Sequence, residues 1–310
     1  MKTKLFAAIL SNTAIALFVL GITYVVTRTD REVYKEGKEL LKTGTIEETI
    51  EHFDKHVTET GSPSSLFGIA WAEWIRGNFI EAETICNFIL DEDLPEEKVR
   101  ANCFYLRGLI YSQQGRHEDS FQNFTRALEI YKQLGESKNL FNTFLGMAEM
   151  FINARDIENA ENFLAEAQNI YPATGGKSLA YYYLLQTNLA FFRRDYQAAL
   201  GNSWKAYEEY ELEGNENGKT NALIYVSLYL MLTGELDKGL AKTLEVAERI
   251  KGSGDENKKF YNDVNFVLAY RCRGLDYADL EQGIRDCIER DDDQLLKENL
   301  EFALVWECNQ

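Results

Sequence analysis

A helical hairpin pattern recurs roughly every 33 to 41 residues between about residues 30 and 290, and it constrains the fold more than any other feature of the sequence. Each copy pairs a turn with the start of an amphipathic helix, most clearly at residues 77–82, 115–120, 155–160, 194–199 and 234–239. One hairpin cannot bury its apolar face alone, so neighbouring copies must stack and share a core. The pattern therefore predicts an all-α fold of about seven stacked hairpins.

Small residues and helix breakers set the phase of the repeat. The units they predict are 30–60, 64–92, 101–134, 141–172, 180–211, 220–252 and 261–290, followed by a last helix at 293–308. Small residues such as Gly108 and Ala160 let the two helices of a hairpin approach closely. Large residues such as Phe124 and Leu164 fill the space against the next hairpin. The three prolines fall between units, which leaves the helix interiors free of the strongest breaker.

Composition excludes several classes of function. The formal net charge is −17, and Lys and Arg form no basic stripe, so we predict no nucleic-acid partner. No glycine-rich phosphate loop or nucleophile elbow is present, so we predict neither an enzyme nor a cofactor. His52 and His56 lie four residues apart on a predicted helix but lack further ligands nearby, so we predict no metal site.

Residues 5–27 contain no charged side chain and are long enough to cross a bilayer as one helix. The alternative is a cleaved secretory signal, since Lys2 and Lys4 supply a basic start. The best small-residue cleavage site, at 14–16, would leave a short apolar stretch before it, and the apolar run continues beyond it. We therefore predict an uncleaved signal anchor, with the lipid bilayer as the partner of residues 5–27.

The predicted domains are a membrane segment at 1–29 and a repeat domain with a capping helix at 30–310. Counting Lys and Arg around the span would keep the carboxyl side in the cytoplasm, whereas a short basic start usually stays inside. We expect a single-pass membrane protein whose repeat domain lies outside the cytoplasm, with a cytoplasmic domain as the alternative. Five cysteines without Cys-x-x-Cys spacing do not decide this, although thiols in an exported domain would have to be buried or partly paired.

Unit 141–172 resembles the tetratricopeptide repeat. Its small and large positions fall in register with the family pattern at Phe144, Met147, Ala148, Phe151, Ala160, Leu164, Ala167 and Pro172. The later spacing, close to 40 residues, is similar to the longer-helix subgroup that includes kinesin light chains and bacterial peptide-pheromone receptors. The resemblance implies a right-handed superhelix whose concave groove binds peptides or helices, with no catalysis in the repeats.

The first helix of each hairpin lines the groove in such a superhelix. The groove residues that this phasing predicts are Trp71, Trp74, Asn102, Tyr105, Asn142, Tyr181, Asn188, Phe191 and Asn221. Asparagine side chains can bond an extended peptide backbone, and aromatic rings can form pockets for apolar anchors. Alternatively, asparagines near helix starts are caps and the aromatic rings belong to the core.

Two functions remain open. The first is a membrane-tethered scaffold that binds partner polypeptides in the groove, and the second is a sensor for a short apolar peptide. Arg107 is the main positive charge on the inner helices. A clamp for an acidic carboxyl-terminal tail is therefore not expected, and the ligand segment should be neutral or apolar.

Overall fold

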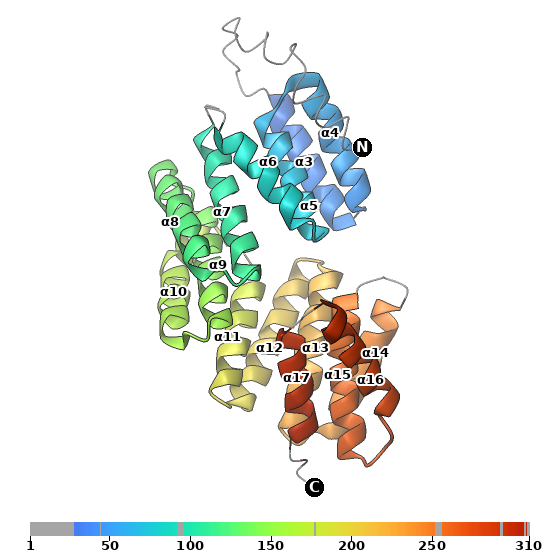
Figure 1. Ribbon diagram of the computed structural model, residues 1–310. Helices are drawn as coiled ribbons and strands as arrows, with labels where there is room; N and C mark the ends of the chain where they lie inside the picture. The colour runs from blue at the N-terminus through green and yellow to red at the C-terminus, as the bar shows by residue number, and fades with distance from the viewer. Residues whose placement is uncertain are drawn as a thin grey trace, which may run out of the picture. The chain divides into compact units, whose positions relative to one another are not determined.

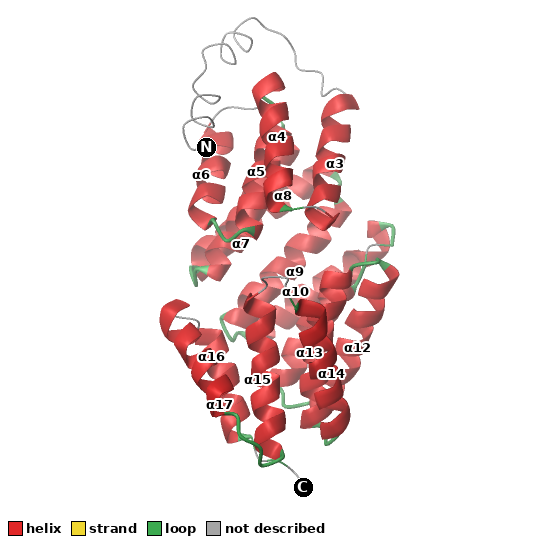
Figure 2. Cartoon of the chain, turned by 90° about the vertical axis from the view of Figure 1, so that its right-hand side faces the viewer, coloured by secondary structure: helices red, strands yellow, loops and turns green. Residues whose placement is uncertain are grey.

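The computed structural model describes residues 28–43, 45–91, 96–176, 178–251, 256–291, 294–306 and 308. Fifteen α-helices and the short 3-10 helix η1 (Tyr171–Thr174) account for this part of the chain, which contains no strand (Figure 2). The chain divides into two compact units, Met1–Gly176 (unit 1) and Lys177–Gln310 (unit 2).

Unit 1 holds four helical hairpins, coloured from blue to green in Figure 1. They are α3 (Arg28–Thr43) with α4 (Ile46–Thr60), α5 (Pro63–Ile75) with α6 (Phe79–Asp91), α7 (Glu97–Gln113) with α8 (His117–Leu134), and α9 (Ser137–Asn153) with α10 (Ile157–Ile170). The first helices pack in sequence, since α5 contacts both α3 and α7, and α7 contacts α9. We call the first helix of each hairpin an inner helix and the second an outer helix.

Unit 2 holds three further hairpins and one extra helix. They are α11 (Ala180–Phe192) with α12 (Tyr196–Leu212), α13 (Glu216–Leu232) with α14 (Leu236–Ile250), α15 (Glu256–Cys272) with α16 (Ala278–Asp291), and then α17 (Gln294–Val305). Inner helix α13 packs against inner helix α15, and α17 contacts both α15 and α16. The structure thus contains the helical hairpins that the repeat predicts.

A phenylalanine from an outer helix wedges two inner helices together at glycine positions. Phe124 of α8 is fully buried. Its ring packs so closely on Gly108 that a Cβ atom added to this glycine would lie only 2.6 Å from the ring carbons. The same ring would lie 3.0 Å from a Cβ on Gly146 of the next inner helix. Phe53 of α4 makes the equivalent contacts with Gly37 and Gly68. The predicted roles of Gly108 and Phe124 are therefore confirmed.

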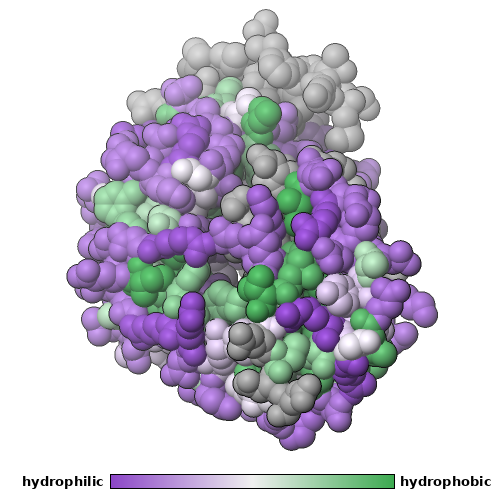
Figure 3. All heavy atoms as spheres, turned by 60° about the horizontal axis from the view of Figure 1, so that its bottom comes forward, coloured by the Kyte–Doolittle hydropathy of each residue, from purple (hydrophilic) through white to green (hydrophobic). Residues whose placement is uncertain are grey.

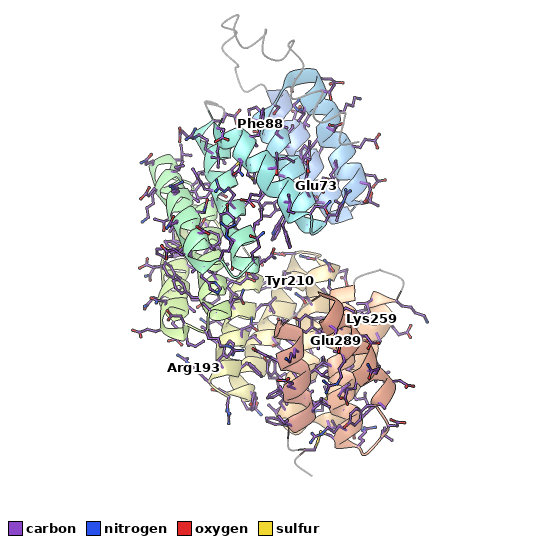
Figure 4. The ribbon with its side chains drawn as sticks, viewed as in Figure 1. Glu73, Phe88, Arg193, Tyr210, Lys259 and Glu289 are labelled. Atoms are coloured by element: carbon purple, nitrogen blue, oxygen red, sulfur yellow. A yellow bond between two sulfur atoms is a disulfide. The ribbon has the colours of Figure 1, made fainter. Side chains whose placement is uncertain are left out.

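Side-chain caps fix the starts of some helices, among them α4, α10 and α12. Thr45 and Glu48 form a reciprocal capping box at the start of α4. The Asp156 carboxylate accepts from the Asn159 amide at 3.2 Å, and Asp195 does the same for Ala198 at 2.9 Å. Glu73, labelled in Figure 4, is buried on α5 and accepts a 2.6 Å bond from the Asn78 side chain, which closes the turn into α6.

The predicted transmembrane helix at residues 5–27 lies outside the described residues. Within the described part, no helix has the length and low polarity that a bilayer crossing requires. The longest there, α8 with 18 residues, carries Glu118, Asp119 and Lys132. The other described helices are 17 residues long or shorter.

This finding corrects two predictions. The first is the fold class of a helical repeat preceded by one transmembrane helix, because the described residues form the helical repeat and include no helix that could cross a bilayer. The second is the location as a single-pass membrane protein with the repeat domain outside the cytoplasm. The predicted boundary between residues 29 and 30 is not tested and stays a prediction.

Candidate functional site

Three aromatic residues from two inner helices of unit 1 form one half-buried cluster, which we call the aromatic site. Trp71 and Trp74 lie on α5, with ring centroids 5.0 Å apart, and Tyr105 of α7 stacks on Trp71 at 6.2 Å with an interplanar angle of 11°. The site continues into the core, because Tyr105 also contacts the ring of Phe124 at 5.8 Å. The structure therefore brings together the three aromatic residues that the sequence predicts for this unit.

Polar groups border the aromatic site. The indole nitrogen of Trp74 donates to the side-chain oxygen of Gln113 at 3.0 Å, and Gln113 is exposed at the end of α7. Burial raises the pKa of Tyr105, and the negative charge of Glu149 on α9 raises it further. Tyr105 therefore stays neutral at physiological pH and can serve a ligand as an aromatic face or as a hydroxyl.

The asparagines predicted for the groove are not helix caps. Asn102, Asn142 and Asn221 lie at least one turn inside α7, α9 and α13, which begin at Glu97, Ser137 and Glu216. The helices start earlier than predicted because residues before each asparagine continue the helical turn. For α13, Asn215 is the N-cap and accepts from the Gly218 amide at 2.8 Å.

Asn102 has a packing role that its position alone does not reveal. Its side-chain oxygen accepts a 2.6 Å bond from the hydroxyl of Tyr131, a buried residue on α8. This bond crosses from the inner to the outer helix of the hairpin. The carbonyl of Asn102 is therefore committed to the hairpin, while Asn142 remains half-buried on α9.

Arg107 takes part in a chain of hydrogen bonds that joins α7 to α6. Its guanidinium donates to the Tyr111 hydroxyl at 3.0 Å, and that hydroxyl donates to Glu83 of α6 at 2.5 Å. The Arg116 guanidinium lies 4.0 Å from the Tyr111 ring centroid. The main positive charge of the predicted inner helices is thus part of the contact between α6 and α7.

The remaining predicted residues lie in unit 2. Tyr181 on α11 is 37% exposed, and Asn188 on α11 and Asn221 on α13 are half-buried. Phe191, at the end of α11, has a different environment. Its ring contacts Phe302 of α17 at 5.2 Å and Tyr229 of α13 at 6.5 Å. Phe191 is therefore covered by the last described helix.

The two histidines considered as metal ligands hold helices together. The ring of His52 contacts the Val33 carbonyl oxygen at 2.9 Å, and Nδ1 of buried His56 lies 2.8 Å from the Ser65 hydroxyl. Their partners lie on α3 and α5, on either side of α4. Both rings are thus used to fix the first hairpins.

Two features of the structure were not predicted from the sequence. One is Gln113, which lies one residue before the turn and carries no pattern that distinguishes it. The other is a disulfide between Cys272 and Cys308. From the sequence we expect thiols of an exported domain to be buried or partly paired, and no spacing singles out these two cysteines. The i, i+4 spacing of Phe302 and Trp306 was the available signal that α17 packs through one aromatic face.

Comparisons with known proteins agree with the geometry. Residues 100–173 match the tetratricopeptide repeat family. No curated protein matches the sequence. The structure of a Rap protein complexed with Competence and Sporulation Factor is similar, with a TM-score of 0.62 at 15% identity over 88% of this chain and 82% of that one.

Two other solved structures show the same fold. The Rap conjugation gene regulator of the plasmid pLS20 in complex with the Phr* peptide has a TM-score of 0.58 at 16% identity, covering 78% of this chain and 73% of that one. The apo quorum sensor NprR from B. thuringiensis has a TM-score of 0.55 at 14% identity, over 98% of this chain and 91% of that one. Together with the family match, these likenesses show a tetratricopeptide-like helical repeat fold.

Proposed function

We propose that this protein binds polypeptide segments on its inner helices, and that the aromatic site of unit 1 is the anchor point. The observation that carries the proposal is the stacking of Trp71 and Tyr105 from adjacent hairpins beside Trp74, with all three rings half-buried. Partly exposed tryptophan and tyrosine rings offer a large apolar area at low cost in conformational entropy, and such residues dominate binding energies.

The expected ligand is an extended or helical segment with an apolar anchor residue. The Arg107 guanidinium already donates to the Tyr111 hydroxyl, which disfavours it as the partner of an acidic tail. Gln113 supplies an amide at the edge of the aromatic site, which suits a peptide backbone. Hydrophilic side chains predominate on the face drawn in Figure 3, with hydrophobic residues gathered in patches between them. We further propose that the protein acts by binding and not by catalysis.

A second candidate is a receptor for a short free peptide. It is supported by the similar structures, two of which contain a bound factor or peptide according to their names and one of which is a quorum sensor. The two candidates differ in whether the segment must be free. A selected peptide should bind equally well alone or fused inside a carrier protein if the protein is a scaffold, and only alone if it is a receptor.

The test is selection of random twelve-residue peptides on the immobilised full chain, followed by fluorescence anisotropy of the best binders. Trp71→Ala should weaken binding by roughly 30-fold, the loss typical of a central aromatic anchor. Phe121→Ala is the matched control, because Phe121 is 36% exposed in the same unit but lies on outer helix α8. Peptides that bind the Trp71→Ala variant as tightly as the unchanged chain would refute the proposal.

A further inference from the structure

Helix α17 packs against α15 and α16, and its aromatic side chains reach the turn between α11 and α12. The Phe302 ring contacts Phe191 of α11 at 5.2 Å, and the Trp306 ring meets Tyr196 edge-on at 5.2 Å. Leu300 and Ala303 are buried in the same apolar cluster. Phe191, one of the residues that the sequence predicts for a peptide groove in this unit, is therefore in contact with a segment of the chain itself.

The contacts of α17 are those of an amphipathic helix bound in a groove. Phe302 and Trp306 are one turn apart on the buried face, whereas Val305 between them is 73% exposed. The partners of this face come from α11, the start of α12 and α15, which belong to two different hairpins. Anchors spaced at i and i+4 that fill an apolar groove are a common mode of helix recognition.

A covalent bond holds this arrangement. Cys272, the last residue of inner helix α15, forms a disulfide with Cys308, just beyond α17. Beside it, the Arg271 guanidinium donates to the Trp306 carbonyl oxygen and lies 3.8 Å from the Cys308 sulfur. Both cysteines line an open hollow of about 450 Å³ together with Met231, Leu236 and Trp306. A small reductant can therefore approach the bond.

We propose that the surface of unit 2 beneath Phe302 and Trp306 is a second binding site for an aromatic amphipathic helix, which α17 closes while the Cys272–Cys308 disulfide is intact and which opens when that bond is reduced. Closing a loop of 36 residues restricts how far α17 can move away, so the disulfide shifts the equilibrium towards the closed form. This proposal concerns unit 2 and is independent of the aromatic site of unit 1.

The opening step is thiol–disulfide exchange with a dithiol. A thiolate of the reductant attacks one sulfur of the bond and displaces the other cysteine as a thiolate. The second thiol of the reductant then resolves the mixed disulfide. Two electrons pass to the protein, Cys272 and Cys308 take up two protons to become thiols, and the reductant leaves as a disulfide.

The test uses the full chain and a fluorescent peptide with the sequence of residues 294–306, which contains no cysteine. Anisotropy is measured with the oxidised chain, with the chain reduced by dithiothreitol, and with Cys272→Ser. We expect the peptide to bind the reduced chain and Cys272→Ser at least about 10-fold more tightly than the oxidised chain. A peptide carrying Phe302→Ala and Trp306→Ala should not bind any of them.

Hydrogen exchange of α17 gives a readout that does not depend on the peptide or on the folding of the variant. Reduction of the unchanged chain should speed exchange of residues 294–305 about 10-fold or more, and reoxidation should reverse it. Equal peptide affinity in the oxidised and reduced forms, or unchanged exchange of α17, would show that α17 is a fixed part of unit 2. An intact mass without the loss of two hydrogens in the oxidised chain would also overturn the proposal. A peptide that binds the aromatic site of unit 1 should bind the oxidised and reduced chains with the same affinity. This result separates the present test from that of the proposed function.

Discussion

Individual residues in the hairpin turns explain why the repeat is visible in the sequence. The residue between the two helices has a positive φ at Gly77, Gly115, Arg155, Arg194, Gly234 and Gly274. This left-handed conformation is natural for glycine and costly for arginine. Where the turn is arginine, the next residue is an aspartate that caps the outer helix, as Asp195 does for Ala198. After Gly115 and Gly234 no side-chain cap forms.

The strained arginine turns make a prediction about stability. Arg194 has a φ of 57°, so Arg194→Gly removes the left-handed penalty, and the greater freedom of glycine in the unfolded chain offsets part of the gain. We expect unit 2 to become more stable by about 0.5–1 kcal/mol in urea unfolding. The reverse change, Gly234→Arg, should destabilise the same unit by at least about 1 kcal/mol. A loss of stability in Arg194→Gly would mean that the arginine side chain contributes more than its backbone costs.

At the scale of elements, small residues decide how closely helices of a hairpin can pack. Gly239 of α14 faces α13, where an added Cβ would lie 2.8 Å from the Ser227 carbonyl oxygen and 2.3 Å from Cγ of Met231. Gly201 of α12 also lies within a helix, but nothing lies within 4 Å of its would-be Cβ. A substitution at Gly239 therefore tests close packing between helices, and one at Gly201 tests helix propensity alone, within the same unit.

Alanine substitutions at these two glycines should have opposite effects. Gly239→Ala must push α13 and α14 apart and should destabilise unit 2 by about 1–3 kcal/mol, because backbone oxygen cannot yield as a flexible side chain would. Gly201→Ala should stabilise it by about 0.5–1 kcal/mol through helix propensity. Urea unfolding followed by circular dichroism measures both. If both variants changed the free energy of unfolding in the same direction, the close contact at Gly239 would not limit how α13 and α14 pack.

At the scale of the whole molecule, buried tyrosines make both units sensitive to alkali. Burial raises the pKa of Tyr34 in unit 1 to about 12, and Cys103 adds to the effect. Burial also raises the pKa of Tyr210 in unit 2 (labelled in Figure 4) to about 12, and Glu213 and Tyr225 add to the effect. Burial likewise raises the pKa of Tyr105, Tyr131 and Tyr229. Ionising any of these groups in the folded state is therefore unfavourable.

Stability should consequently fall between pH 10 and pH 12. Below pH 10 a tyrosine is protonated in both states, and above it the unfolded chain loses the proton first, so unfolding is favoured. Each such residue costs its unit about 1.4 kcal/mol per pH unit in this window. Tyr210→Phe should reduce the slope for unit 2 by about that amount in urea unfolding at pH 9 to 11.5. An unchanged slope would show that Tyr210 ionises freely in the folded chain.

Local patterns in the sequence predicted the hairpins, the small positions such as Gly108, and the three members of the aromatic site. Each of these depends on spacing within one helix or between adjacent hairpins, where periodicity places side chains on a known face. The alternative that Asn102 caps a helix start was wrong, and no described helix supports the membrane span predicted at residues 5–27. A helix start depends on which residues continue a turn, and the structure does not support the membrane helix that hydrophobicity suggested.

Long-range placement could not be predicted from spacing. The bond from Tyr131 to Asn102 joins residues 29 positions apart, and the disulfide joins residues 36 apart. Nothing in the period of the repeat says that α17 packs against α15 and α16 or that Phe302 contacts Phe191. Periodicity reports which face of a helix is apolar, whereas the choice of partner for that face is made when distant elements compete to bury it.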